Sequence, residues 1–195
     1  MLLLALTAIE VLNLIAGAEQ RQQPRRAQYV YQEHQENWRF DPYGRRIESS
    51  LRTKTFEVLL IQGQRYRKLI ARNGTPLSLA EQWEVEQDMQ RAATTPAAPA
   101  TSLRDLAQTH QLSLQENTLV ASSDSKSHQF TFHPVTHAIE RQVTTSATAR
   151  MMLDYIQLPG GVSLPKRIEV DFKVSDIHGL QISTFSQHRK IERND

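Results

Sequence analysis

The sequence predicts an α+β protein that is built mostly from antiparallel β-strands. Two observations carry this prediction: the first third holds three strand-like segments, and the last third is strand after strand with a short turn signal between each pair. Strands joined by such short turns pair as hairpins, and hairpins build antiparallel sheets. The 195 residues, of which 39% are hydrophobic and 23% charged, are enough for one domain with its own core.

The composition and charge exclude several classes of protein and site. There are no cysteines, which removes disulfides, thiolate zinc sites and a cysteine nucleophile. The formal net charge is only +2, and Lys and Arg are scattered among Asp and Glu outside residues 20–26 and 189–193. A nucleic-acid-binding protein usually concentrates its positive charge on one face. The sequence therefore predicts no nucleic-acid partner.

The first 20 residues allow two interpretations. The apolar run ends in small residues at 16–18, the pattern of a signal-peptide cleavage site. However, no basic residue precedes the run, Glu10 interrupts it, and its apolar residues fall near helical spacing, which favours an amphipathic helix. The run is too short and too interrupted for a membrane span. We assign residues 1–18 to a signal-peptide remnant or a first helix, and residues 19–195 to a single domain.

Three strands are predicted before residue 73. Residues 27–40 alternate with the period of two that is typical of a strand and are rich in aromatic side chains. After a turn at Asp41–Gly44, which carries Pro at its second position, a long strand is predicted over residues 46–61, with an almost continuously apolar end. A tight reversal then leads to a return strand over residues 65–72.

A turn and a helix follow the return strand directly. Asn73 and Gly74 supply the positive φ that a tight turn needs. Ser78 and Glu81 have the S-x-x-E spacing of a capping box. A helix is therefore predicted from Leu79 to about residue 92.

The middle of the chain changes composition. Residues 93–102 are rich in Ala, Pro and Thr, so we expect a flexible linker there within one domain. Ser102 and Asp105 repeat the capping pattern, and Leu103 and Leu106 give the segment that follows an apolar stripe, which predicts a second helix. Six strands are then predicted, over residues 117–122, 127–134, 137–145, 149–158, 162–174 and 179–191.

No pattern in the sequence predicts catalysis, a cofactor or a metal ion. His128, His133 and His137 come closest to a metal-ligand set, but they are spread over a hairpin and are more simply surface histidines. Gly160 and Gly161 lie between strands, which is typical of a turn and not of a phosphate-binding loop. There is no G-x-S-x-G or H-E-x-x-H motif. We therefore expect a protein that is not an enzyme and has no cofactor.

Two parts of the sequence resemble one protein superfamily. Residues 29–82, with Tyr29-x-Tyr31-x-Glu33 and the phrase TFEVLLIQGQRYRKLIARNGTPLS, are similar to exported bacterial proteins related to the outer-membrane lipoprotein carrier LolA. The ending, in which a Leu-Pro pair precedes a long strand, resembles the final hairpin of that superfamily. The resemblance covers most of the chain. It implies an incomplete β-barrel, which is one strongly curved antiparallel sheet with helices covering its open concave side.

The resemblance also implies a function. Carriers of this superfamily hold acyl chains in the apolar space between sheet and helices, and here the Asn-Gly turn would place the helix of residues 79–92 over the mouth of the sheet. We therefore expect an exported or periplasmic monomer without enzymatic activity, with a lipid or lipoprotein acyl chain and an envelope protein as partners.

The alternative is a structural or protein-interaction module of the cell envelope with a filled cavity. In that case the large apolar residues of the strands and the helix are core residues rather than a groove lining. The residues that we expect to line the groove are Tyr31, Phe56, Val58, Tyr66, Trp83 and Phe172.

Overall fold

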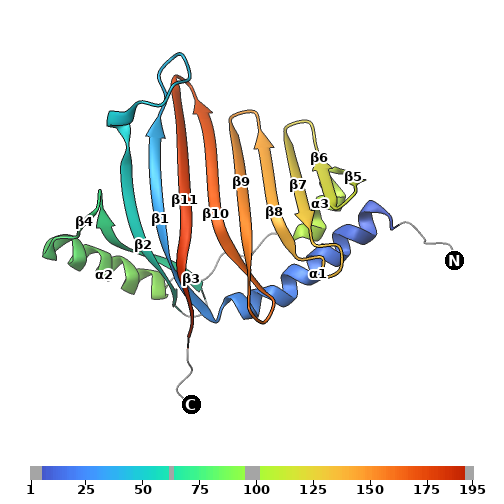
Figure 1. Cartoon of the computed structure of the whole chain (residues 1–195), viewed down its shortest axis with the longest axis horizontal. Coiled ribbons are helices and arrows are strands. Elements are labelled where there is room, and N and C mark those ends of the chain that lie inside the picture. Colours follow the sequence, from blue (N-terminus) through green and yellow to red (C-terminus); the bar gives the residue numbers. More distant parts are fainter. Residues whose placement is uncertain (1–5, 62–63, 95–101, 192–195) are drawn as a thin grey trace.

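The computed structural model describes residues 6–61, 64–94 and 102–191 of the chain. Their strands form one 11-stranded antiparallel sheet in the order β4-β3-β2-β1-β11-β10-β9-β8-β7-β6-β5 (Figure 1). β4 and β5 lie at opposite edges, so the sheet is open and not closed into a barrel. The predicted fold class, α+β with mostly antiparallel strands in an open curved sheet accompanied by helices, is confirmed.

The first helix, α1 (Ala8–Arg26), begins at a capping box. The Glu10 carboxylate accepts the Thr7 N–H at 2.7 Å, and the Thr7 hydroxyl accepts the Glu10 N–H. One stripe of the helix is buried, as its apolar spacing predicts: Val11, Leu12, Ile15 and Ala18. The helix continues without a break across residue 18.

The first four strands form an antiparallel meander. Asn73 and Gly74 join β3 to β4 with φ values of 48° and 76°, so the predicted tight turn is confirmed. The strand predicted from residue 46 begins only at Arg52, because Arg46 makes an isolated bridge to Phe40 and a 3₁₀ turn follows it. The elements are β1 (Tyr29–Arg39), η1 (Glu48–Ser50), β2 (Arg52–Ile61), β3 (Gln64–Arg72) and β4 (Thr75–Pro76).

The second helix, α2 (Leu79–Thr94), starts where the capping box predicts. The Glu81 carboxylate accepts the Ser78 N–H at 2.9 Å and the Ser78 hydroxyl at 2.8 Å. The helix ends two residues later than predicted, so the first described residues of the expected linker are helical. Residues 95–101, the rest of that linker up to Ser102, lie outside the described residues.

The last third is a meander, as predicted, with one strand that the pattern did not identify. The second predicted helix ends at Thr109, and Leu112 and Leu114 after it alternate along the strand β5. The elements are η2 (Leu103–Asp105), α3 (Leu106–Thr109), β5 (Gln111–Gln115), β6 (Thr118–Ser122), β7 (Lys126–Phe132), β8 (Ile139–Ser146), β9 (Ala149–Leu158), β10 (Val162–Val174) and β11 (Ile177–Lys190).

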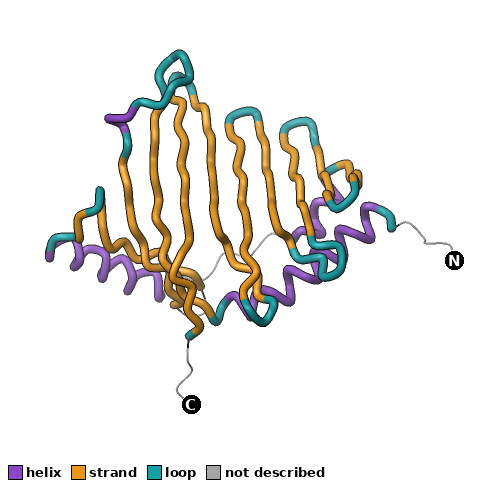
Figure 2. The backbone as a smooth tube through the Cα atoms, viewed as in Figure 1, coloured by secondary structure: helices purple, strands orange, loops and turns teal. Residues whose placement is uncertain are grey.

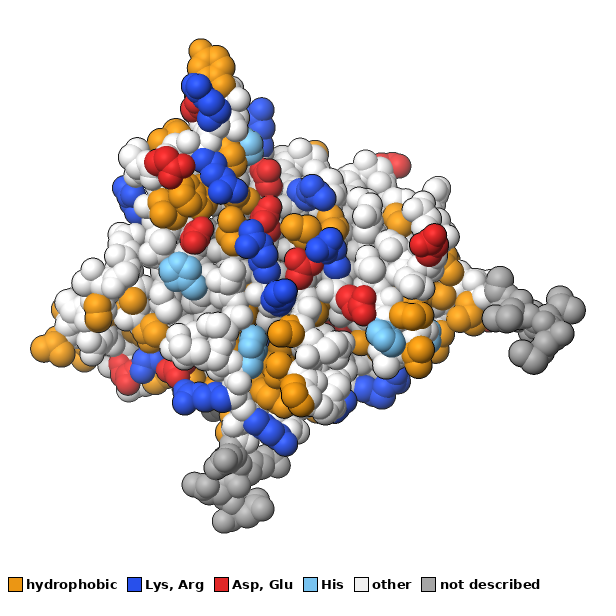
Figure 3. Space-filling model, in the orientation of Figure 1, with side chains coloured by type: hydrophobic (Ala, Val, Ile, Leu, Met, Phe, Trp, Pro, Cys, Tyr) orange, Lys and Arg blue, Asp and Glu red, His pale blue; other side chains and the backbone are white. Residues whose placement is uncertain are grey.

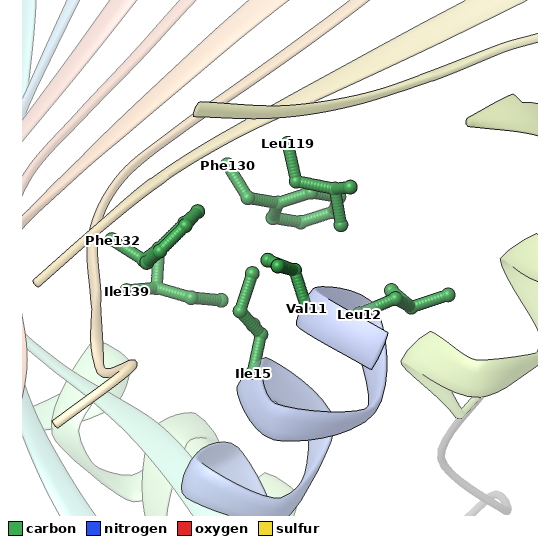
Figure 4. Packing of buried hydrophobic residues seen from close by; sticks show 7 residues of the cluster. All are labelled: Val11, Leu12, Ile15, Leu119, Phe130, Phe132 and Ile139. Carbon is green, nitrogen blue, oxygen red and sulfur yellow. The ribbon is translucent and has the colours of Figure 1, made fainter. Parts of the chain in front are cut away.

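A cluster of buried hydrophobic residues lies at one end of the sheet, between α1 and the strands β6 to β8. We call it the α1 cluster; Figure 4 shows side chains of the helix pointing at those of the strands. Tyr155 and leucines from η2, α3 and β5 pack around it. The members of the cluster are Val11, Leu12, Ile15, Leu119, Phe130, Phe132 and Ile139.

The register defines two faces of the sheet. One row of paired residues runs from Leu119 on β6 through Phe130 on β7 and onward across every strand to β2. Because directly paired residues point to the same side, this row marks the face on which the α1 cluster lies, which we call the inner face. Figure 2 shows that α1 and α2 both lie toward one end of the strands.

The outer face carries several ion pairs between neighbouring residues. Arg141 on β8 forms an ion pair with Asp154 on β9 at 2.6 Å, and Arg167 forms one with Glu169, two residues further along β10, at 2.9 Å. Figure 3 shows this face, with blue and red side chains gathered over the middle strands. In the described part of the chain, no helix is long and apolar enough to cross a membrane.

Candidate functional site

The inner face carries an apolar patch next to the α1 cluster. On β9 and β10, Leu153 pairs with Ile168 and Met151 pairs with Val170, so four aliphatic side chains form a square on one side of the sheet. Phe172 continues the same face of β10. All five side chains are half-buried, and none belongs to the α1 cluster or packs against it. We call Met151, Leu153, Ile168, Val170 and Phe172 the open patch.

Polar residues border the open patch on both sides. On β11, Ser183 and Gln181 pair with Ile168 and Val170. On β8, Gln142 and Thr144 pair with Leu153 and Met151. The patch is therefore a defined apolar strip on an otherwise polar stretch of the inner face, between the core at one end and the β1–β3 meander at the other.

A cavity of about 470 Å³ lies beside the patch, between α1, η2 and the sheet. Its volume is within the range of small-molecule sites. Gln142, which pairs with Leu153, and Tyr155, which follows Leu153 by two residues on β9, both line the cavity from the side of the sheet. Its lining is mostly polar: Ala16, Glu19, Gln20, Gln23, Ser102, Leu103, Arg104, Ile139, Gln142 and Tyr155.

The end of α1 is fixed to the sheet by polar contacts. Gln22 is buried, and its amide accepts the Ser163 N–H at 3.1 Å and donates to the Gly161 carbonyl at 3.0 Å. Arg26 donates to the Ser163 carbonyl at 2.6 Å and forms a two-bond ion pair with Glu19. These polar contacts hold the helix end against β10.

Two tyrosines and two arginines lie together where α1 meets β1. The Arg26 guanidinium lies 5.1 Å from the centre of the Tyr155 ring, and the Arg65 guanidinium 5.4 Å from that of Tyr31. Burial raises the pKa of Tyr155 to about 12, with Glu19 adding to the rise and the two arginines opposing it. Burial likewise raises the pKa of Tyr31. Both phenols are therefore neutral hydrogen-bond donors at physiological pH.

A buried ion pair stands beside this group on the inner face. Glu33 is almost fully buried, and its two carboxylate oxygens accept hydrogen bonds from Arg67 at 2.7 and 2.8 Å. Arg67 also lies 4.1 Å from the centre of the Phe56 ring. The pair neutralises two charges that would otherwise oppose apolar binding on this face.

The structure brings together three of the six residues predicted to line a groove. Tyr31 pairs with Val58, and Phe56 pairs with Glu33 one step along the same inner face. The Tyr31 ring contacts Phe185 edge-on, with ring centres 5.5 Å apart. Tyr31 and Val58 are buried and Phe56 is half-buried.

The other three predicted residues lie elsewhere. Phe172 shares the inner face but stands over Gly179 at the opposite end of the strands. Tyr66 pairs with Leu59 on the outer face and donates to the Val85 carbonyl of α2 at 3.3 Å. Trp83 is 66% exposed on α2. Lys68, on the same face as Tyr66, pairs with Glu86, so α2 contacts the outer face of β3 and not the inner face over which the resemblance would place it.

Sequence reasoning missed most of the open patch and Tyr155. The alternation of residues 168, 170 and 172 was visible, but only Phe172 was chosen. On β9, Met151, Leu153 and Tyr155 alternate as well. The alternation is hard to see in the sequence because Met152 and Ile156 place apolar side chains on the opposite face of the same strand. The signal that identifies them is the pairing of β9 with β10, which follows from the Pro159-Gly160-Gly161 turn.

The three histidines do not form a metal site. His128 lies on the inner face with its ring 3.0 Å from the Thr144 hydroxyl, whereas His133 accepts backbone N–H groups of its own turn. Within residues 6–61, 64–94 and 102–191, no three His, Asp or Glu side chains are placed to hold a metal ion.

No family model and no curated protein matches the chain. Among solved structures it is similar to a LolA superfamily protein of Nitrosomonas europaea, at 9% identity over 98% of this chain and 96% of that one, with a TM-score of 0.36. It is also similar to a putative outer membrane lipoprotein-sorting protein domain from Vibrio parahaemolyticus, at 10% identity over 92% and 94% of the chains, with a TM-score of 0.45.

A DUF1329 family protein from Desulfovibrio piger is a third similar structure, at 9% identity over 95% of this chain and 93% of that one, with a TM-score of 0.42. Two of these three descriptions name the group of proteins that the sequence resembles. Each of the three TM-scores is below 0.5.

Proposed function

We propose that this protein is a non-enzymatic, exported or periplasmic binding protein that holds a lipid or lipoprotein acyl chain on the open patch. The observation that carries the proposal is the patch itself. Five adjoining apolar side chains lie half-buried on the inner face, outside the core and bordered by polar residues. An acyl tail bound to such an apolar strip removes apolar surface of both the tail and the protein from water, which is favourable.

The energy available fits a lipid tail. Each CH₂ group removed from water contributes about 0.8 kcal/mol, so ten such groups contribute about 8 kcal/mol at most. Immobilising the tail costs several kcal/mol of that gain. The net result is a reversible complex, which suits a protein that takes up a lipid and releases it again.

A second candidate is a protein-interaction module of the cell envelope with a filled interior. The α1 cluster favours it, because Leu12, Ile15 and Phe130 are fully buried, so the helix itself covers the apolar side chains of β6 to β8. On this hypothesis the open patch is a contact surface for protein, and purified samples carry no lipid.

Neighbouring methionines on β9 provide a matched test. Met151 lies on the inner face within the open patch, whereas Met152 pairs with Val143 and Glu169 on the outer face, and both are half-buried. We expect wild-type protein to bind a fluorescent fatty acid in a saturable way. Met151→Gln should weaken this binding about tenfold, the equivalent of one or two CH₂ contacts, and Met152→Gln should leave it unchanged.

The same samples decide between the two candidates. Native mass spectrometry of protein purified from a bacterial host should show a bound lipid species that Met151→Gln reduces. Absence of saturable binding together with lipid-free protein would refute the carrier function. Equal losses in the two variants would instead show that the probe does not occupy the open patch.

A further inference from the structure

We infer that the lipid bound on the open patch carries an anionic head, and that Arg65 contacts this head together with the hydroxyl groups of Tyr31 and Tyr155. This inference rests on the proposed function, because it assigns the polar end of the same ligand. The group forms a cationic site at the end of the inner face where α1 meets β1.

The arginines around this site differ in whether a carboxylate pairs with them. Arg26 is paired with Glu19 at 2.6 Å, and Arg67 is paired with Glu33 at 2.7 Å. Arg65 is exposed, and no carboxylate in the described part of the chain lies within ion-pairing distance of it. Of the three arginines gathered here, Arg65 therefore supplies the uncompensated positive charge.

The stacking of Arg65 prepares it to bind an anion. Its guanidinium lies over the Tyr31 ring, and that ring is itself fixed by Phe185 and by His188, whose ring centre is 5.5 Å away. A guanidinium held by its flat face keeps the N–H groups at its edge available, and their fork matches the oxygens of a phosphate or carboxylate. The aromatic contact thus reduces the entropy that binding would cost.

The site adjoins the open patch through two routes. Tyr155 lies two residues after Leu153 on the inner face of β9. Tyr31 is connected to the same place by His188, whose Nε2 lies 3.3 Å from the carbonyl oxygen of Pro165, and Pro165 pairs with Tyr155. A tail on Leu153 and Ile168 consequently brings its head group to the two phenols.

Two amphiphiles that have the same tail but different head groups distinguish the contribution of the head from that of the tail. Decyl phosphate and decyl glucoside, each below its micelle concentration, would be titrated into the full chain by isothermal titration calorimetry. We expect decyl phosphate to bind roughly fivefold more tightly, as one exposed charged contact predicts. Arg65→Gln should remove this preference while leaving the affinity for decyl glucoside unchanged, and Arg65→Lys should retain part of it. Arg45→Gln, an exposed arginine between β1 and β2, should change neither affinity.

Each outcome bears on a different claim. Equal affinities of wild-type protein for the two amphiphiles would overturn the anionic head and leave the tail site intact. A preference that persists in Arg65→Gln would overturn the role of Arg65. Inorganic phosphate that binds as tightly as decyl phosphate would overturn the assignment to a lipid head, because the site would then serve a free anion. Binding of neither amphiphile would overturn the proposed function itself.

Discussion

The two ends of the inner face are completed in different ways. Over β6 to β8, the first half of α1 packs Val11, Leu12 and Ile15 against the apolar side chains of the sheet, and these side chains are buried. Over β9 and β10, the alternation of apolar residues continues along the strands, but the helix meets the sheet through Gln22 and Arg26 instead. The same helix therefore closes one end with apolar packing and leaves the other accessible with polar contacts.

This difference separates stability from binding along one surface. The closed end removes large side chains fully from water, and such burial is the main stabilising contribution in folding. The open end leaves equally apolar side chains half-exposed, which contributes less to stability but keeps them available to a ligand. The comparison predicts that substitutions at the two ends act on different measurements.

Two isoleucines test the comparison most directly. Ile139 is 2% exposed in the α1 cluster, and Ile168 is half-buried in the open patch. Ile139→Ala should lower the free energy of unfolding by about 2–5 kcal/mol, because it leaves a cavity, and Ile168→Ala by only about 1 kcal/mol. Urea denaturation measures both values. Equal losses would mean that the open patch is part of the core and the distinction fails.

The pH dependence of stability tests the junction between the two ends, where Tyr155 lies. Its pKa is raised to about 12 in the folded protein, so the folded state favours the protonated phenol. The contribution, about 3 kcal/mol, is fully present below pH 10 and is lost as the pH rises from about 10 to 12. Tyr155→Phe should flatten the unfolding free energy measured across this interval. Tyr43→Phe, at an 83% exposed position, is the control and should leave it unchanged.

The smallest effect is expected on α1 itself. Gly17 lies within the helix, and a Cβ placed there would meet only the Arg21 side chain at 3.5 Å, an ordinary contact. Gly17→Ala should therefore stabilise the protein by about 0.5–1 kcal/mol, since alanine favours a helix. Gly74→Ala should do the opposite, because Gly74 has a φ of 76°. A loss of stability in Gly17→Ala would contradict this expectation, because it would mean that a methyl group at residue 17 collides with a neighbouring side chain.

Much of the fold could be predicted from local patterns. The capping residues Ser78 and Glu81 set the start of α2, and the Asn73-Gly74 turn set the reversal before it. These signals depend only on backbone chemistry within a few residues. β5 was missed because Leu112 and Leu114 give too short an alternation to be distinguished from the end of a helix.

The candidate site depended on information that no local pattern holds. Tyr66 and Arg67 are adjacent on β3, and which of them faces inward is decided by pairing with β2, where Arg67 lies opposite the inward-facing Val58 and Tyr66 lies opposite Leu59. The choice of Tyr66 over its neighbour followed side-chain type and not register. The grouping of Tyr31 with Tyr155 requires the pairing of β1 with β11, which joins segments from opposite ends of the chain.

That pairing determines how the protein must fold. The Thr184 hydroxyl donates to the His34 carbonyl although the two residues are 150 positions apart in sequence. Contacts between such distant segments form slowly, because a long loop must close before any hydrogen bond compensates its entropy. The β1–β3 meander and the β5–β10 meander can each assemble locally, and the central pair joins them only after β11 has been synthesised. Until then both halves expose unpaired strand edges, so this protein should depend on chaperones during its biogenesis more than its modest size suggests.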